Sequence, residues 1–275
     1  MNKIKISTAL AAIAGLLLGI NATAQDKIVV DGSTTVGPIA KAFAEYYMKA
    51  NQGVNITVSE SGSGNGAKSL INAACDVATM SRPMKSSEKT SAKDAGVMVV
   101  ENIVAMDGIA MIVHPSNPVE GLTIEQIKKI YLGKITNWKS VGGPDSKIVV
   151  ISRETNSGTY ETFETMVLDK QKMASGVEYV GSSGAIRQRI LSTEGAIGFV
   201  GLAFLEGVKA LKVNDIKPTP ETVKKKEYPI SRPLYMYTNG RPKEGSHLSK
   251  YVNLYKTAEG QKIIEDTGFV PITEK

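Results

Sequence analysis

Strand and helix signals alternate along nearly the whole chain, and this alternation is what most constrains the fold. Short runs rich in Val and Ile are followed by segments in which apolar residues recur every three or four positions. Strands are expected at residues 28–30, 54–58, 77–80, 97–105, 109–113, 147–151, 197–200 and 234–237. Helices are expected at 36–47, 67–74, 123–131, from 159 onward, 185–191, 246–255 and 258–266. This order predicts an α/β protein with mostly parallel sheets.

Four of the strand-to-helix turns combine glycine with serine or threonine. They are DGSTTVG at 31–37, SESGSGNG at 59–66, SRETNSGT at 152–159 and GSSGA at 181–185. Ligands of parallel α/β sheets bind at the carboxyl ends of the strands, where these turns lie. The first N–H groups of a helix lack internal partners and carry the positive end of its dipole. One such turn is also what ordinary helix capping requires, whereas several converging turns predict a site for a small tetrahedral oxyanion.

Two arginines stand beside these turns. Arg153 ends an apolar run four residues before the sequence SGT, and Arg82 follows Ser81 after a short predicted strand. A guanidinium adds a full charge and a bidentate contact to an anion site. The alternative for either residue is a solvated surface charge or a cap on a carbonyl. The binding role is favoured more strongly for Arg153.

The first two dozen residues have the features of a secretory signal. Lys3 and Lys5 precede an apolar run at 9–20, and small residues at 22–24 form a cleavage site before Gln25. The apolar run is too short to span a bilayer comfortably. We therefore expect a signal peptide at residues 1–24 and an exported, periplasmic mature protein. The alternative is a buried core helix.

Composition argues against several other classes of protein. The chain is 42% hydrophobic and 22% charged, which is ordinary for a globular protein and unlike a disordered one. Subtracting the two signal lysines from 33 basic residues leaves 31 against 27 acidic residues, a net charge of +4. The basic run at 224–226 is typical of a solvated helix face, with contact to a partner as the alternative. We expect no nucleic acid partner.

Patterns for catalysis and metal binding are missing from the sequence. Neither histidine lies in a cluster of metal-ligand residues, and His114 in IVHPSNP is expected to cap a turn. No HExxH, CxxC or GxSxG motif occurs, and GSGNG lacks the GK(S/T) of a nucleotide-binding loop. The single cysteine, Cys75, is expected to pack as a small apolar residue. We therefore expect a binding protein and no enzyme, without cofactor or metal.

Seven segments follow one another over nearly the whole mature chain: DGSTTVGPIAKAF, SGSGNGAKSL, ATMSRPM, IKKIYLGKITNWKSVGG, SRETNSGTYETF, EGAIGFVGLAFL and TGFVPI. Together they resemble the phosphate-binding proteins that serve ATP-driven (ABC) phosphate importers, in the periplasmic binding protein superfamily. The most specific pieces are GKITNW and the arginine followed four residues later by SGT. The resemblance implies inorganic phosphate and a membrane ABC permease as partners, and a monomeric chain.

The resemblance also implies a two-lobed periplasmic-binding-protein fold of type II. Each lobe would be a mostly parallel sheet flanked by helices, and two crossings would join the lobes near residues 107–108 and 231–234. Lobe 1 would then comprise residues 25–107 plus 233–275, and lobe 2 residues 108–232. The lobes would close on the ligand like a hinge.

Matching the family pattern position by position assigns the phosphate site. The first turn contributes Ser33 and Thr34, and the glycine loop contributes Ser63, with Ser61 and Gly64 as possible substitutes. Arg153 matches the phosphate-binding arginine, and the start of the following helix contributes its donors. These helix residues are Ser157, Gly158 and Thr159.

One position departs from the best-studied version of the pattern, in which an aspartate follows the serine. This chain has Arg82 there, in SRPM. The aspartate accepts the proton that hydrogen phosphate carries and sulfate lacks, and an arginine cannot accept a proton. If Arg82 faces the ligand, the site has two guanidiniums. The acceptor is then Asp31, Glu60, Asp107 or a backbone carbonyl, and the sequence leaves this choice open.

Three alternatives accompany this prediction. The same fold would also suit sulfate, molybdate or a phosphonate. A secreted phosphatase is disfavoured by the missing metal ligands. A surface adhesin or a structural exported protein would bind no anion.

Overall fold

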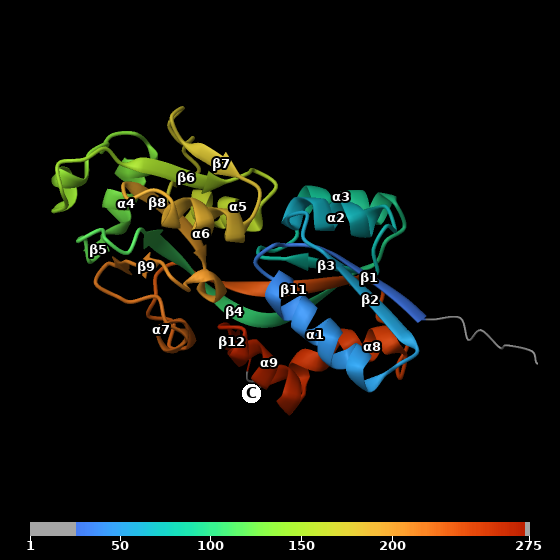
Figure 1. The fold of residues 1–275 in the computed structure, drawn as a ribbon. Helices are drawn as coiled ribbons and strands as arrows, with labels where there is room; N and C mark the ends of the chain where they lie inside the picture. Colours follow the sequence, from blue (N-terminus) through green and yellow to red (C-terminus); the bar gives the residue numbers. More distant parts are fainter. Residues whose placement is uncertain (1–25, 273–275) are drawn as a thin grey trace, which may run out of the picture.

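Two α/β lobes lie on either side of two long strands, β4 (Val99–Val113) and β11 (Ser231–Asn239), in the computed structural model (Figure 1). The structure describes residues 26–272. The expected signal peptide and its cleavage site therefore lie outside the described residues. Between residues 26 and 272, no helix has the length and apolar character needed to cross a membrane.

Lobe 1 is built on the strand order β2-β1-β3-β11-β4. Strand β1 runs parallel to β2 and β3, whereas β11 is antiparallel to β3 and β4. The elements of this lobe are β1 (Asp26–Gly32), α1 (Gly37–Ala50), β2 (Val54–Ser59), α2 (Ser63–Ile71), β3 (Val77–Met80), α3 (Ser86–Asp94), α8 (His247–Val252), η3 (Leu254–Lys256), α9 (Ala258–Asp266) and β12 (Val270–Pro271). The C-terminal helices α8 and α9 return to pack beside α1, so the two ends of the described chain share one lobe (Figure 1).

Lobe 2 continues the sheet in the order β4-β8-β6-β7. Strands β8, β6 and β7 are parallel, and β4 joins them antiparallel to β8. The elements of this lobe are β5 (Gly121–Leu122), α4 (Ile124–Tyr131), η1 (Trp138–Val141), β6 (Val149–Arg153), α5 (Gly158–Met166), β7 (Glu178–Val180), α6 (Ser183–Leu191), β8 (Ala196–Gly201), η2 (Leu202–Phe204), β9 (Lys209–Ala210), β10 (Lys212–Val213) and α7 (Pro220–Lys224). The predicted two-lobed α/β fold is thus confirmed; the strands that precede helices are parallel, and the crossing strands are antiparallel to their neighbours.

Each lobe has its own hydrophobic core. In lobe 1 the predicted apolar face of α1 is buried against the sheet, with Ile39 and Phe43 fully inaccessible. In lobe 2 the rings of Phe163 and Phe199 stack with centroids 4.1 Å apart. Cys75 is buried in a smaller cluster of lobe 1, as predicted. These cores anchor the helices α1, α5 and α6, whose first turns meet where the two lobes touch.

The two strands predicted at 97–105 and 109–113 form the single strand β4, so that prediction was wrong in its boundary. The intervening residues 106–108 stay extended because they pair antiparallel with residues 231–233 of β11. Both lobe crossings are therefore made by one hydrogen-bonded strand pair. This strand pair is the connection between the two lobes.

Other differences concern polar segments. Helix α3 was not predicted because only one of its residues, Ala92, is buried and the apolar pattern is missing. Helix α2 begins at Ser63, four residues earlier than predicted, so the glycine loop supplies its first turn. That turn is thereby placed at the lobe boundary.

Candidate functional site

Hydroxyl groups from both lobes meet between the starts of α1, α5 and α6. The Thr35 Oγ1 of lobe 1 lies 2.9 Å from the Thr159 Oγ1 and 3.5 Å from the Ser183 Oγ of lobe 2. All three residues are at most 1% exposed. The turns singled out in the sequence at 31–37, 152–159 and 181–185 therefore converge in one buried place.

Arg153 reaches into this place from the end of β6. Its Nη1 donates to Thr34 Oγ1 at 3.0 Å and to Ser183 Oγ at 3.1 Å. Its Nε and Nη2 donate to the carbonyls of Val180 and Gly181. Arg153 is 1% exposed, and no carboxylate of residues 26–272 forms an ion pair with it. A buried cation held only by neutral groups is costly, and it indicates an anion site.

The electrostatics of Arg153 agree with this geometry. Burial and, to a smaller extent, the nearby positive charge of Arg232 lower the pKa of Arg153 to about 10. An anion bound beside both guanidiniums would reverse these effects because it stabilises the charged form.

The start of α5 supplies backbone donors at the same place. Ser157 is the N-cap, and its Oγ accepts from the backbone N–H groups of Thr159 and Tyr160. A Cβ atom at Gly158 would lie 2.6 Å from the Ser63 Oγ and 2.7 Å from the Ser81 Oγ. Gly158 is therefore needed for the close approach of α5 to lobe 1.

Two predicted serines of lobe 1 border the same gap. The Ser33 Oγ accepts from the N–H of Thr35 and Val36, and Ser33 is 2% exposed. The Ser63 Oγ accepts from the Ser81 N–H at 3.0 Å, and Ser63 is fully buried. The Ser33 hydroxyl has a proton that an anion could accept, and the Ser63 hydroxyl can donate either to an anion or to Ser81 Oγ at 3.3 Å.

Ser61 and Gly64 already have other partners. The Ser61 hydroxyl donates to Asp31 Oδ1 at 2.7 Å. The Gly64 N–H donates to the carbonyl of Asn156 at 2.9 Å, which is a backbone hydrogen bond between the lobes. This arrangement therefore favours Ser63 over Ser61 and Gly64 as a donor to the anion.

Arg82 is held by two carboxylates. Its Nη1 and Nη2 each donate to Glu88 at 2.7 Å, and its Nε lies 2.9 Å from Glu161 Oε2. The charge of Arg82 is compensated by these partners. The geometry therefore favours a structural role for Arg82 over the direct anion contact considered from the sequence.

Asp107 and Arg232 form the one buried ion pair between the crossing strands, and the sequence did not indicate Arg232 as a site residue. Arg232 donates from Nε and Nη2 to Asp107 Oδ2 at 3.2 and 2.9 Å, and from Nη1 to the Ser81 carbonyl at 3.1 Å. Burial raises the pKa of Asp107, although Arg232 opposes this effect. The usable signal was the position of both residues at the predicted crossings.

The buried charges between the lobes do not balance. Once Arg82 is set aside with its own carboxylates, two buried guanidiniums, Arg153 and Arg232, face a single buried carboxylate, Asp107. The excess of one positive charge suits an anion. Within residues 26–272 no group of three or more His, Cys, Asp and Glu is placed to hold a metal ion.

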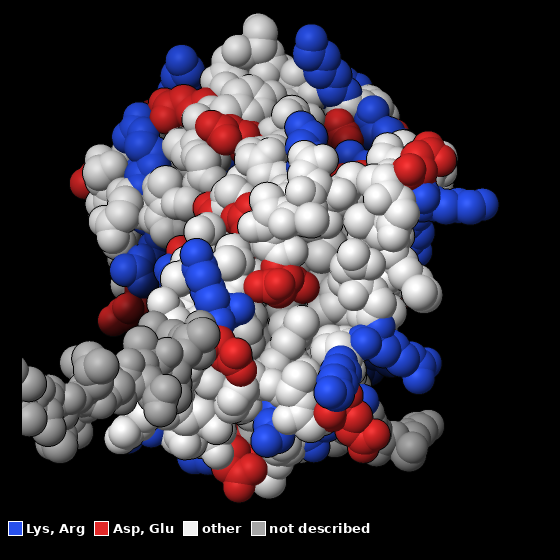
Figure 2. All heavy atoms as spheres, turned by 90° about the vertical axis from the view of Figure 1, so that its right-hand side faces the viewer, with Lys and Arg blue, Asp and Glu red and all other residues white. Residues whose placement is uncertain are grey.

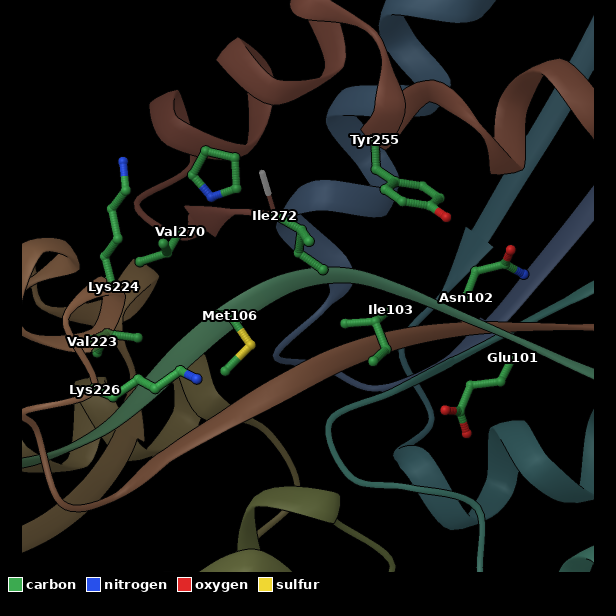
Figure 3. A pocket seen from close by; sticks show the side chains of 11 residues that line it. Glu101, Asn102, Ile103, Met106, Val223, Lys224, Lys226, Tyr255, Val270 and Ile272 are labelled. Atoms are coloured by element: carbon green, nitrogen blue, oxygen red, sulfur yellow. The ribbon is translucent and has the colours of Figure 1, made fainter. Parts of the chain in front are cut away.

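A hollow lies beside β4 and is also lined by residues of α7 and of the C-terminal segment (Figure 3). It has a volume of about 620 Å³, and its walls are largely apolar, with Met106, Val223 and Ile272 among its lining residues. None of the turns that supply hydroxyl donors reaches it. We therefore do not assign the anion to this cavity.

The basic run predicted to be solvated is exposed, and Lys225 pairs with Glu221 one turn earlier in α7. On the face of the molecule in Figure 2, Lys and Arg side chains are interspersed with Asp and Glu. That face offers no broad patch of one sign.

His114 Nδ1 accepts from the Ser116 N–H, so its predicted turn-capping role is confirmed.

Comparisons with known proteins show which family this chain resembles. The model of the PBP superfamily domain matches residues 20–255. Protein SphX of Synechococcus elongatus is 33% identical over 284 residues, covering 97% of this chain and 84% of that protein. The phosphate-binding protein PstS of Bacillus subtilis is 33% identical over 255 residues, covering 91% of this chain and 82% of that protein.

Solved structures are similar over the same extent. A phosphate ABC transporter substrate-binding protein of Clostridium perfringens, solved with bound phosphate, is 34% identical with a TM-score of 0.84, covering 90% of this chain and 100% of the other. An ABC-type phosphate transport receptor of Vibrio cholerae is 30% identical with a TM-score of 0.71, covering 88% of this chain and 99% of the other.

Proposed function

The chain belongs to the PBP superfamily, among its phosphate-binding proteins, and from this premise we propose that it captures inorganic phosphate between its lobes and delivers it to an ABC importer. The observation that carries the proposal is Arg153, a buried cation whose guanidinium donates only to neutral hydroxyls and carbonyls. The phosphate bound in the C. perfringens relative supports the choice of anion.

The phosphate contacts follow from the converging turns. We assign them to the hydroxyl and backbone donors of Ser33, Thr34, Ser63, Ser157, Gly158 and Thr159, together with the guanidinium of Arg153. Arg232, which is paired with Asp107, adds positive charge nearby. Ser183 joins the set because it shares Arg153 Nη1 with Thr34. Neutral hydroxyls and N–H groups orient the ion, and the guanidiniums neutralise its charge.

Closure strengthens these contacts. The site is buried when the lobes meet, and hydrogen bonds to a charged ion are stronger where water is excluded. The closed arrangement is then what a permease would recognise. The lobe boundaries 25–107 plus 233–275 and 108–232 are part of this proposal. The two main hydrophobic clusters support them, with Val270 of lobe 1 packing into the cluster of lobe 2.

Asp107 is the proposed acceptor for the proton of hydrogen phosphate. Among the other carboxylates considered, Asp31 accepts from Ser61 and Ser69, and Glu60 pairs with the solvent-exposed Lys41. Asp107 is fully buried, and a Cβ at Gly201 would touch both its carboxylate and the methyl group of Thr35. Asp107 accepts from Arg232 and from the Leu202 N–H, and it lies near Thr35, whose hydroxyl is 2.9 Å from that of Thr159.

We also propose that the protein is exported, with residues 1–24 as its signal peptide, and that it acts as a monomeric receptor without catalytic activity. The apolar run at 9–20 after two lysines supports export. Its family consists of binding proteins, which supports a receptor role.

Parallel calorimetric titrations of the mature protein with phosphate, sulfate, molybdate and methylphosphonate test the function. Phosphate is expected to bind at least about a hundredfold more tightly than sulfate. Tighter binding of another of these anions would replace phosphate as the ligand. No heat and no thermal shift with any of them would refute the oxyanion receptor, and turnover of a chromogenic phosphate ester would indicate an enzyme.

A further inference from the structure

Four charged side chains meet where the two lobes touch, outside the proposed phosphate site. Lobe 1 contributes Arg82, Lys85 and Glu88, and lobe 2 contributes Glu161 from the first turns of α5. Two of these residues are positive and two negative, so the cluster has no net charge. We call this set the Arg82 clasp.

The contacts within the clasp divide into two kinds. Arg82 and Glu88 belong to the same lobe and are joined by two hydrogen bonds of 2.7 Å. Glu161 belongs to the other lobe, and its Oε2 lies 2.9 Å from Arg82 Nε and 2.7 Å from Lys85 Nζ. When the lobes separate, the first kind of contact can persist and the second must break.

Burial makes the contact between the lobes stronger than an ordinary surface pair. The Arg82 side chain is 5% exposed and that of Glu161 is 15% exposed. Surface ion pairs contribute little because water and salt screen them, and this pair is largely shielded from both. Glu88 also holds the guanidinium in place before Glu161 arrives, which reduces the entropy lost when the pair forms.

The stem of Arg82 connects the clasp to the anion site. A Cβ at Gly158 would lie 3.0 Å from Arg82 Cγ, so the stem packs against the first residue of α5. On the same helix, the Thr162 hydroxyl is 3.5 Å from the Ser81 carbonyl. Glu161 therefore draws onto lobe 1 the helix end whose N–H groups are assigned to phosphate.

We propose that the Arg82 clasp holds the lobes closed and sets the rate at which phosphate is released, without contacting the anion. Glu161 and Arg82 are then positioning residues. The choice of phosphate as ligand rests on the proposed function, whereas the effect on lobe closure does not. Because the clasp is neutral and lies outside the site, it should affect all bound anions alike.

The direction in which one substitution changes the binding affinity distinguishes this proposal from a direct role of Arg82 in binding. Glu161→Gln removes a negative charge near the site. If Arg82 contacted the anion, freeing it from Glu161 would tighten binding. If the clasp holds the lobes closed, the same substitution weakens binding because the closed state loses an ion pair.

The experiment compares wild type, Glu161→Gln and the matched control Glu164→Gln. Glu164 lies on the same helix, and its carboxylate accepts from the Tyr160 hydroxyl of its own lobe at 3.1 Å, so the control makes the same charge change without touching lobe 1. Phosphate-loaded protein is mixed in a stopped-flow instrument with an excess of a fluorescent phosphate reporter. Glu161→Gln is expected to raise the dissociation rate about tenfold, equivalent to a loss of about 1.4 kcal/mol, with the association rate and the phosphate-to-sulfate ratio unchanged.

The same proteins are examined without phosphate by small-angle X-ray scattering. The radius of gyration of Glu161→Gln is expected to exceed that of wild type and of Glu164→Gln, because the clasp favours closure even without ligand. Dissociation rates within twofold of wild type, tighter binding, or equal effects of both substitutions would overturn the proposal. If wild type itself bound no phosphate, the proposed function would fail, and the scattering comparison would still decide on the clasp.

Discussion

Asp107 and Arg232 lie opposite each other on the two strands that join the lobes, with Arg232 Nη2 2.9 Å from Asp107 Oδ2 although 125 residues separate them in the chain. The pair is buried where the strands cross between the lobes, and Asp107 lies near the methyl group of Thr35. One side chain can neutralise an anion, and the other can accept its proton. Under the proposed function, the crossing strands would contribute to phosphate binding as well as connecting the lobes.

Asp107→Asn should reduce discrimination between phosphate and sulfate. The amide of Asn can donate to a fully deprotonated anion, whereas the carboxylate repels it. We expect the ratio of phosphate to sulfate affinity, measured by calorimetry, to fall at least about thirtyfold, corresponding to about 2 kcal/mol. The ratio within one variant cancels any general effect on folding.

Asp31→Asn is the matched control for this ratio. Asp31 carries the same charge and also lies near the glycine loop, but it accepts from the hydroxyls of Ser61 and Ser69. Its ratio should stay within about threefold of wild type, which is a difference below 1 kcal/mol. A large change of this ratio in Asp31→Asn, with none in Asp107→Asn, would identify Asp31 as the proton acceptor in place of Asp107.

Arg153→Ala should abolish tight phosphate binding without unfolding the protein. Removing a buried charged partner of an ion costs about 2–5 kcal/mol of binding free energy, which corresponds to about a thirtyfold to several-thousandfold loss of affinity. Unfolding is not expected because Arg153 is a costly unpaired charge in the absence of an anion. Calorimetry measures the affinity, and thermal denaturation measures the stability.

Arg187→Ala serves as its control, since Arg187 is also in lobe 2 and pairs with the exposed Glu206. Its affinity and melting temperature should match wild type. Unchanged affinity in Arg153→Ala would remove the central support for the proposed site.

Much of this site could be predicted because its donors follow strands directly in the chain. Arg153 ends β6, and the SGT sequence begins α5, so local composition placed both at a strand-to-helix junction. The fold and the family suggested by the seven segments are confirmed by the topology and by the comparisons. Local signals sufficed where neighbours in the sequence remain neighbours in space.

The remainder depended on pairing between distant segments. Arg232 enters the site only because β11 pairs with β4 in one register, and no local pattern encodes that register. Arg82 lies in a turn that the sequence marked as a possible anion site, but its partner Glu161 belongs to a distant helix. The neighbouring contact between Ser81 and Thr162 joins residues 81 positions apart. Sequence reasoning found the turns and missed which charges would be compensated.

Phosphate affinity should decline at high pH because of Arg153. Burial lowers the pKa of this guanidinium to about 10, below the ordinary value of 12.5. The charged form is therefore disfavoured in the unliganded fold, so this group reduces stability below about pH 10, and the reduction disappears as pH rises toward the unfolded pKa. Over the same range the anion loses a cationic partner.

Calorimetric titrations at intervals from about pH 8 to 11 measure this effect. The dissociation constant should be nearly constant at first and then rise about tenfold per pH unit above about pH 10, as expected for loss of one required proton. A flat profile across the whole range would show that the pKa of Arg153 is not lowered.

Gly158→Ala should weaken phosphate binding while leaving the unliganded protein as stable as wild type. Its backbone is helical, and alanine is favoured over glycine in a helix by up to about 1 kcal/mol. The added Cβ would meet lobe 1 atoms, namely Ser63 Oγ at 2.6 Å, Ser81 Oγ at 2.7 Å and Arg82 Cγ at 3.0 Å. The strain therefore arises only when the lobes close.

Gly184→Ala, at the start of α6, is the control, since its Cβ would come no closer than 3.9 Å to the Ser182 Oγ. Calorimetry should show a loss of at least about tenfold in phosphate affinity for Gly158→Ala, equivalent to about 1.4 kcal/mol of closure strain, and none for Gly184→Ala. Equal affinities in the two variants would mean that the bound state does not need α5 this close to lobe 1.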